Sequence, residues 1–212
     1  MLSTEQALAA LPLYHVDEVW HVGSFNPEDK NMHGSSQEGT GLSVSECPED
    51  WCGIVRLGGY PTWQLTRQGA AFLDYHELTP AQRDALVIWG IQKGYAEMRE
   101  MFQLSYYDSE DENTRFQLLD TREEAELEGA EMEEAVIEPV TVPFPTEAMV
   151  VRLKFKASPI EVLDFLATFY VEDETTLDGV WWHDNYDPDA LSAPRGVIMV
   201  RALPTWQRQV QA

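Results

Sequence analysis

The chain has 212 residues, 44% of them hydrophobic, and it carries 37 acidic against 14 basic side chains, which gives a formal net charge of −23. This length and composition support a single globular domain over residues 1–212 and exclude a disordered chain. The negative charge argues against direct binding to a nucleic-acid backbone, unless the acidic surface itself imitates a nucleic acid and captures a basic protein.

Membrane and disulfide-rich classes are disfavoured as well. No apolar run approaches the roughly 20 residues that span a bilayer, and the first residues lack the basic and apolar regions of a secretory signal. Cys47 and Cys52 are too few for a disulfide framework, and they lack the histidine spacing of a structural zinc site. We therefore expect a cytoplasmic protein without membrane contact, with both cysteines as structural thiols and no metal.

The first half of the chain predicts short strands followed by one long helix. Segments in which apolar and β-branched residues lie between turn residues predict strands at residues 17–25, 41–45 and 62–67. Thr79 and Gln82 have the spacing of a capping box, with proline at the first helical position. Apolar residues then recur at roughly helical spacing as far as Phe102, so the pattern predicts a helix of about five or six turns, interrupted at most by Gly90 and Gly94.

Residues 108–138 hold 13 acidic side chains and two arginines, a local net charge of −11. A run of like charges repels itself and resists burial, so a solvated, partly helical insertion or loop over residues 108–147 is one interpretation. The other is a surface that docks a basic protein partner or imitates DNA.

The remaining third predicts further short elements. Period-two alternation predicts a strand at residues 148–156, and residues 178–183 and 196–200 predict two more. Ser158 with Glu161 forms a capping box ahead of a short helix with a broad apolar face, and Ser3 with Gln6 forms another near the start of the chain. Without a glycine-rich phosphate loop, this order favours an α+β fold with a mixed or antiparallel sheet and flanking helices.

The first motif is Glu-Val-Trp-His-Val-Gly-Ser-Phe, in which His21 lies within a buried strand. One interpretation is a packed core histidine with both ring nitrogens satisfied. The other is a ligand-binding histidine, because Gly23 and Ser24 turn the backbone at once and let a small molecule approach it.

Two further motifs follow. In the second, Gly41 opens a strand on which Ser43 and Ser45 share a face, and a helical turn with acidic residues leads to Trp51. A glycine turn that feeds an edge strand is the structural alternative. In the third, adjacent tryptophans must face opposite sides of a strand, so we expect Trp182 or its neighbour to face outward, where it could hold a flat ring.

Together the three motifs resemble the ADP-ribosyltransferase superfamily, including its RNA 2′-phosphotransferase branch. That superfamily has a histidine and a glycine on its first core strand, then a Gly-Leu strand with serine that leads to a short helix, and a late strand with the third functional position. The resemblance covers the core strands, about half of the chain, and leaves the long helix and the acidic stretch without counterpart.

The resemblance implies an enzyme that uses NAD as a substrate and transfers ADP-ribose to a macromolecular acceptor, as toxins and effectors of that superfamily do. It implies that His21 bonds the ribose hydroxyls and that Gly23 and Gly41 allow close approach of the nicotinamide. Ser43 and Ser45 would then hydrogen-bond the substrate. Ser24, Trp51, Trp182 and Arg195 complete the expected NAD-binding set.

The superfamily also uses a late-strand glutamate, which stabilises positive charge on the ribose as nicotinamide leaves. Gly179 or Val180 occupies that position here. Asp184 is the preferred substitute, and Asp178 is the alternative, because both share a face with Trp182 on a regular strand.

Some polar residues remain open in interpretation. Arg195 could clamp a phosphate or pair with one of many acids. His183 could be a second base or merely the end of its strand, and residues 74–77 are expected to form a solvated loop. A second function class also stays open, that of a non-catalytic acidic interaction protein, such as a nucleic-acid mimic or an inhibitor of a basic partner.

Overall fold

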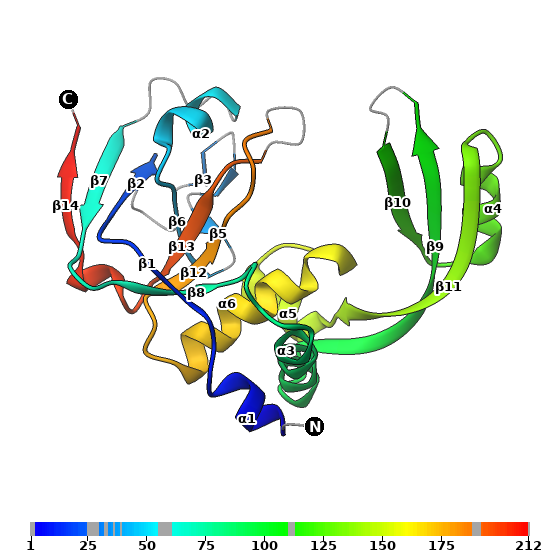
Figure 1. Cartoon of the computed structure of the whole chain (residues 1–212), viewed down its shortest axis with the longest axis horizontal. Coiled ribbons are helices and arrows are strands. Elements are labelled where there is room, and N and C mark those ends of the chain that lie inside the picture. Colours follow the sequence, from blue (N-terminus) through cyan, green and yellow to red (C-terminus); the bar gives the residue numbers. More distant parts are fainter. Residues whose placement is uncertain are drawn as a thin grey trace. The chain divides into compact units, whose positions relative to one another are not determined.

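A computed structural model describes residues 3–24, 30–31, 34–35, 37–38, 40–54, 61–109, 113–187 and 192–211. The chain forms two compact units, one from residues 1–89 and 163–212 and the other from residues 90–162 (Figure 1). Both combine helices with sheets, so the predicted α+β class with mixed and antiparallel sheets is confirmed. None of the described helices is long and apolar enough to cross a membrane.

The first unit contains a mixed sheet that carries most of the predicted motif residues. Its strand order is β1 (Leu13–His15), β8 (Ala71–Asp74), β12 (Gly179–Trp182), β13 (Arg195–Met199), β6 (Gly41–Val44) and β5 (Gln37–Glu38). β8 and β12 are parallel, and every other pairing in this sheet is antiparallel.

A smaller antiparallel sheet of the same unit has the order β14 (Gln207–Val210), β7 (Thr62–Thr66) and β2 (Glu18–Val22). A bridge between Trp20 and Ser45 joins β2 to the end of β6, with N–H···O distances of 2.8 and 2.9 Å. A short hairpin of β3 (Lys30–Asn31) and β4 (Gly34–Ser35) completes the described strands of this unit. Its shorter helices are α1 (Thr4–Leu8), α2 (Pro48–Ile54) and the 3-10 turn η2 (Leu203–Thr205).

The core of the first unit joins these two sheets. Val19 and Leu65 of the smaller sheet lie in one buried cluster with Leu42, Phe72 and Trp181 of the mixed sheet. Burial of each such side chain contributes roughly 1.5–3 kcal/mol, which fixes the two sheets against each other. Both adjacent tryptophans of β12 are buried, so the expectation that one would face outward is wrong. The reason is that both faces of β12 are covered, and Trp182 packs beside Tyr75 at a centroid distance of 5.7 Å.

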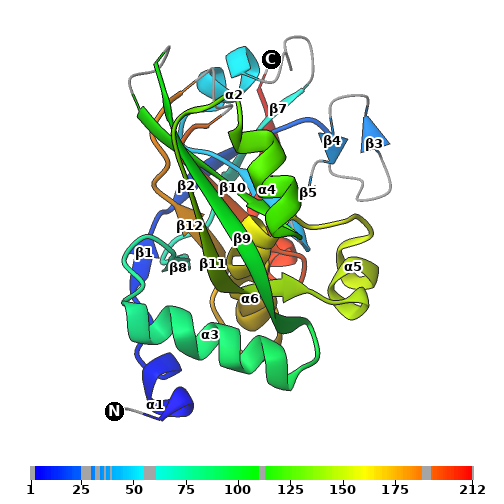
Figure 2. The same cartoon turned by 90° about the vertical axis from the view of Figure 1, so that its right-hand side faces the viewer.

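The second unit is built on a three-stranded antiparallel sheet with the order β10 (Asn113–Leu119), β9 (Ala96–Asp108) and β11 (Glu133–Pro145). Helix α4 (Arg122–Gly129) lies across one face of this sheet (Figure 2), where Ala125 and Leu104 are fully buried. Helix α5 (Glu147–Leu153) and the 3-10 turn η1 (Pro159–Glu161) follow. Helices α3 (Pro80–Gln92) and α6 (Val162–Glu174) connect the two units along the chain.

The predicted helix after Thr79 is correct in its start and wrong in its length. Thr79 and Gln82 form the expected capping box, with bonds of 2.9 and 3.3 Å. The helix ends at Gln92, because Gly94 takes a left-handed conformation and its N–H bonds Ile91, while the next N–H reaches Gly90. These two hydrogen bonds form a Schellman motif, which ends the helix. Phe102 therefore lies in β9.

The predicted strand at residues 148–156 is wrong, because α5 occupies most of it. Thr146 caps that helix through its hydroxyl, which accepts the N–H of Met149, and Met149 and Leu153 are buried one turn apart. Lys154 ends the helix in a left-handed conformation with φ 65°. Apolar residues at i and i+4 served a helix face here, whereas the alternation near the end of the segment imitated a strand.

The acidic stretch is partly helical, as predicted, but most of it is sheet rather than loop. Its described residues form β10, α4 and the first half of β11, and residues 110–112 lie outside the described residues, as does residue 25 at the end of the first expected strand. Thr121 and Glu124 form a capping box at the start of α4. The glutamates of α4 and of the start of β11 are exposed, so the charges face water while Ala125 and Leu104 supply the core.

Gly179 tests the packing of the mixed sheet. A Cβ at this position would overlap the backbone carbonyl of Val197 on β13, so Gly179→Ala forces the two strands apart. We expect a loss of about 1–3 kcal/mol in the free energy of unfolding, measured by urea titration. Gly53→Ala in α2 is the matched control, because a Cβ there meets no atom within 4 Å and should add about 0.5–1 kcal/mol. Equal stability of the two variants would contradict the close packing.

Candidate functional site

One edge of the mixed sheet collects polar side chains from four strands. β8, β12 and β6 run in the same direction, and β13 runs against them between β12 and β6. The carboxyl ends of the first three and the amino end of β13 therefore meet at one edge. Asp74, Trp182 and Arg195 are terminal residues of their strands there, and His183 and Ser45 come directly after theirs. We call this region the sheet edge; ligands commonly bind at the carboxyl ends of strands in sheets with parallel pairs.

His183 and Asp74 form a pair at the sheet edge although they are 109 residues apart. Nε2 of His183 lies 3.1 Å from Oδ2 of Asp74, and the side chains are 40% and 10% exposed. The backbone N–H of Glu77 donates to the other carboxylate oxygen of Asp74 at 3.4 Å. A largely buried carboxylate thus orients an imidazole that still reaches solvent.

A second ion pair lies beside the first. Arg195 donates through Nε to Oδ2 of Asp184 at 2.8 Å, and Nε2 of His76 lies 3.4 Å from the other oxygen. The Arg195 guanidinium also lies over the ring of Trp182, 4.8 Å from its centroid. His183, which follows β12, therefore faces Asp74 at the end of β8, and His76, which follows β8, faces Asp184 after β12. Arg195 pairs with an acid, which was one of the two interpretations of this residue.

Burial changes the acid–base properties of this second pair. It lowers the pKa of Arg195 to about 10, so the guanidinium remains cationic at neutral pH. Burial also raises the pKa of Asp184, and the nearby imidazoles of His76 and His183 oppose that rise. The shift of Asp184 marks a carboxylate that is poorly hydrated, a setting in which a charge acts more strongly on a bound ligand.

Two tyrosines border the sheet edge. The Tyr14 hydroxyl donates to Glu46 at 2.8 Å, and its ring meets that of His183 edge-on at a centroid distance of 4.7 Å. Burial and the Glu46 carboxylate raise the pKa of Tyr14 to about 12. Burial, together with Asp164, raises the pKa of Tyr75 as well. Both phenols stay protonated at neutral pH, so they can shape the site and donate hydrogen bonds but cannot act as bases.

His21 lies away from any open surface of the described structure. His21 is only 2% exposed. Its Nδ1 lies 2.8 Å from the carbonyl oxygen of Ser43, and its Nε2 lies 3.1 Å from that of Ser24. Burial lowers the pKa of His21, against the effect of the two carbonyls. The ring therefore ties β2 and the turn after it to β6, as the core interpretation of this histidine describes.

The other residues of the first two motifs also hold the backbone in place. Gly23 has φ 123°, which favours glycine, and its N–H donates to Pro61 at 2.9 Å. Ser45 donates through Oγ to the carbonyl of Pro194 at 2.6 Å, and Nε1 of Trp51 donates to the same oxygen at 3.3 Å. A Cβ on Gly41 would meet the backbone of Ile198 at 2.6 Å, so that glycine serves the packing of β6 against β13. Ser45 and Trp51 thus fix the residue that precedes Arg195.

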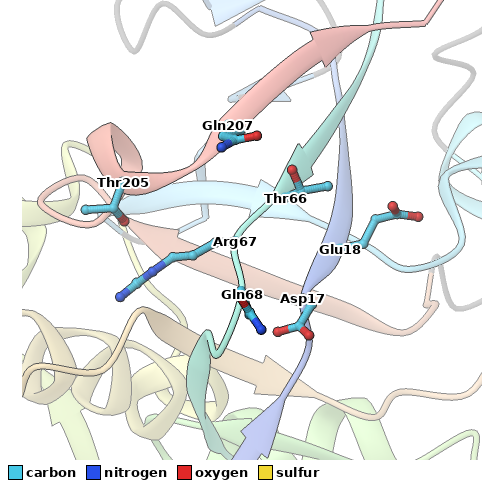
Figure 3. Close-up of a pocket in the computed structure, with 7 residues that line it drawn as sticks. All are labelled: Asp17, Glu18, Thr66, Arg67, Gln68, Thr205 and Gln207. Atoms are coloured by element: carbon cyan, nitrogen blue, oxygen red, sulfur yellow. The ribbon is translucent and has the colours of Figure 1, made fainter.

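Asp178, the alternative carboxylate, lies at the opposite end of β12 from Asp184. It is buried, accepts the N–H of Ala71 at 2.9 Å, and forms an ion pair with Arg67. Arg67 lines a polar pocket of about 460 Å³ between the start of β2 and the end of β7 (Figure 3). The charged groups of that pocket are already engaged, because Arg67 pairs with Asp178, Asp17 accepts the N–H of Gly69 at 2.7 Å, and Glu18 accepts a hydrogen bond from Nε2 of Gln64 at 2.8 Å.

The remaining candidates for chemistry are metal-ligating side chains and the two cysteine thiols. Within the described ranges, no three His, Cys, Asp or Glu side chains converge in a way that could hold a metal ion. Burial, with nearby acids, raises the pKa of Cys47, and burial with Glu49 raises that of Cys52. Both thiols are therefore protonated at neutral pH and are poor nucleophiles.

Asp74 and His76 were not predicted as site residues, because residues 74–77 were expected to form a solvated loop. That expectation is wrong for Asp74, which is buried at the end of β8. A usable signal was present in the sequence, since Asp-Tyr-His and His-Asp each follow a short apolar strand. The parallel pairing of those strands was needed to bring the two short motifs together.

The chain matches no protein-family model, no curated protein and no solved structure.

Replacement of His21 tests its structural role. His21→Gln removes the ring and should lower the free energy of unfolding by about 1–3 kcal/mol at neutral pH, because the carbonyl that accepts the single N–H of the neutral ring loses this fixed donor. The unfolded chain takes up a proton near pH 6.5, whereas the buried ring resists it. The contribution of His21 is therefore present above about pH 6.5 and is lost as the pH falls below it. The stability difference between wild type and variant should narrow toward pH 5 in urea titrations.

His15→Gln is the control, because His15 lies exposed on β1 with one bond to the carbonyl of Ala70. It separates the effect of burial from that of removing an imidazole. A stability difference for His21→Gln that stays constant from pH 8 to about pH 5 would contradict the assignment of a buried neutral ring.

Proposed function

We propose that the chain is an ADP-ribosyltransferase-like enzyme that binds NAD as a substrate at the sheet edge and transfers ADP-ribose to a macromolecular acceptor. The observation that carries this proposal is the arrangement of Asp184 and Arg195. The two side chains form a partly buried ion pair at the carboxyl end of β12, and the guanidinium of Arg195 lies over the ring of Trp182.

The three motifs of the resemblance support the proposal because contacts connect them in order. β2 with His21 is tied to β6 through Ser43 and through the Trp20–Ser45 bridge. Ser45 in turn bonds Pro194, the neighbour of Arg195, and Arg195 pairs across the ladder with Trp182. Segments that are far apart in sequence thus adjoin the same sheet edge.

The chemistry of NAD cleavage suits these groups. As the bond between ribose C1′ and the nicotinamide nitrogen breaks, positive charge builds on the ribose, and the fixed carboxylate of Asp184 stabilises it. The guanidinium of Arg195 is suited to the pyrophosphate, and the buried ring of Trp182 supports that guanidinium from behind at 4.8 Å. His21 acts here by holding β2 and β6 in register, because its ring nitrogens already face the carbonyls of Ser43 and Ser24.

The proposal is tested by calorimetric titration of the full chain with NAD, together with an assay for released nicotinamide. Wild type should bind with micromolar affinity. Arg195→Gln should weaken binding about 10-fold to 100-fold, the effect of losing a hydrogen bond to a charged group. Asp184→Asn should keep binding and release nicotinamide about 100-fold more slowly, because a neutral amide no longer stabilises the cation.

The second unit supplies a matched control for these variants. Arg115 and Asp108 form another Arg–Asp ion pair, with an N–O distance of 2.8 Å, on β10 and β9. Arg115→Gln and Asp108→Asn should therefore leave NAD binding and turnover unchanged. Folded wild-type protein that gives no binding heat with NAD would contradict the proposal.

A second candidate function rests on the exposed charge of the second unit. Every described glutamate between residues 120 and 138 is exposed, and α4 presents four of them, namely Glu123, Glu124, Glu126 and Glu128. A surface of this kind suits a non-catalytic interaction with a basic partner. Added salt weakens such an association, because it screens the charges.

This candidate is tested with a lysine decapeptide as the basic probe. Glu126→Gln together with Glu128→Gln should weaken binding about threefold to tenfold at low salt, as expected for the loss of two exposed ion pairs. The control is the double change of Glu5 and Glu49 to glutamine in the first unit, where both side chains are exposed. Equal weakening by the two double variants would mean that the probe senses net charge alone, and it would remove the case for a docking surface on α4.

A further inference from the structure

Asp74 is a carboxylate whose position is fixed from several sides. It is the last residue of β8, and its own N–H donates to the carbonyl of Pro12 at 3.0 Å. Its two carboxylate oxygens face the N–H of Glu77 and the ring of His183. A carboxylate held in this way can neither rotate nor leave the imidazole without breaking those bonds, so it sets the orientation of the ring.

His183 combines that fixed partner with access to solvent. Nε2 faces Asp74, the Tyr14 ring supports the imidazole edge-on, and the side chain remains 40% exposed. When Nε2 donates its proton to Asp74, Nδ1 carries the lone pair and can accept a proton from a substrate. This is the arrangement of a general base oriented by a buried carboxylate.

His76 is less suited to this role. Its partner Asp184 is shared with Arg195, which makes the shorter contact of 2.8 Å against 3.4 Å for His76. The carboxylate of Asp74, by contrast, accepts the N–H of Glu77 and faces the ring of His183. His183 also directly precedes Asp184 in sequence, so the end of β12 presents a base next to the carboxylate that stabilises the ribose.

From this geometry we infer that His183 is the general base of the proposed reaction and that Asp74 is its positioning residue. The inference rests on the proposed function. With water as the acceptor, the C1′–N bond breaks and its electron pair leaves with nicotinamide, while the water oxygen bonds to C1′. The water proton passes to Nδ1 of His183, Asp74 stabilises the resulting imidazolium, and the proton then passes to solvent. The products are ADP-ribose, nicotinamide and one proton.

The test measures NAD binding and nicotinamide release by the full chain in water, with His183→Ala and Asp74→Asn. Both variants should bind NAD within about twofold of wild type and release nicotinamide about 100-fold more slowly, the usual effect of losing a general base. Added imidazole should restore turnover to His183→Ala and leave Asp74→Asn unrescued. His15→Ala, which removes an exposed histidine of β1, should keep the wild-type rate.

The outcomes separate this inference from the proposed function. NAD binding by wild type tests the function itself, and its absence overturns both. If either variant binds NAD and turns it over at the normal rate, the roles inferred for His183 and Asp74 are overturned and the proposed function is not. A slow His183→Ala variant that imidazole does not rescue has the same meaning. If His183→Ala fails to fold, the isosteric Asp74→Asn decides the question, because a merely structural pair would lose stability and keep its rate.

Discussion

The parallel pairing of β8 with β12 is the contact on which the sheet edge depends. It aligns Trp181 with Asp74, although more than a hundred residues, including the whole second unit, lie between them in sequence. Since parallel strands end at the same edge, the polar residues after β8 and after β12 are brought together. Gly179 makes the neighbouring contact possible, because β12 packs against the carbonyl of Val197 too closely for a side chain.

Charge is distributed according to hydration. The buried carboxylates of Asp178 and Asp74 have Arg67 and His183 as partners, and the partly buried Asp184 pairs with Arg195. An unpaired charge at such positions would cost several kcal/mol, so Arg67 and Arg195 stand beside these acids in a chain with net charge −23. The glutamates of α4 and β11 remain in water, where like charges are screened.

Local signals in the sequence were sufficient for much of the fold. The capping boxes at Ser3, Thr79 and Ser158 are all present, and the strands expected around residues 17–25, 41–45, 62–67, 178–183 and 196–200 overlap β2, β6, β7, β12 and β13. Gly94 could have ended the long helix, but the apolar residues of β9 continued its pattern by coincidence of spacing. The partnership of Asp74 with His183 could not be predicted, because it depends on sheet order rather than on neighbouring residues.

Because His21 is buried within β2, the groups of the proposed reaction lie at the ends of strands rather than within one. A buried ring whose nitrogens face two backbone carbonyls has little capacity left for a ribose, and its bond to Ser43 instead fixes β2 beside β6. That registry carries through the Trp20–Ser45 bridge and the Ser45–Pro194 bond to Arg195. In the proposed reaction, His21 therefore acts at a distance from the reacting atoms. Groups that must exchange protons or meet a cation need partial exposure, and His183 and Asp184 have it because they lie just beyond the last paired residue of β12.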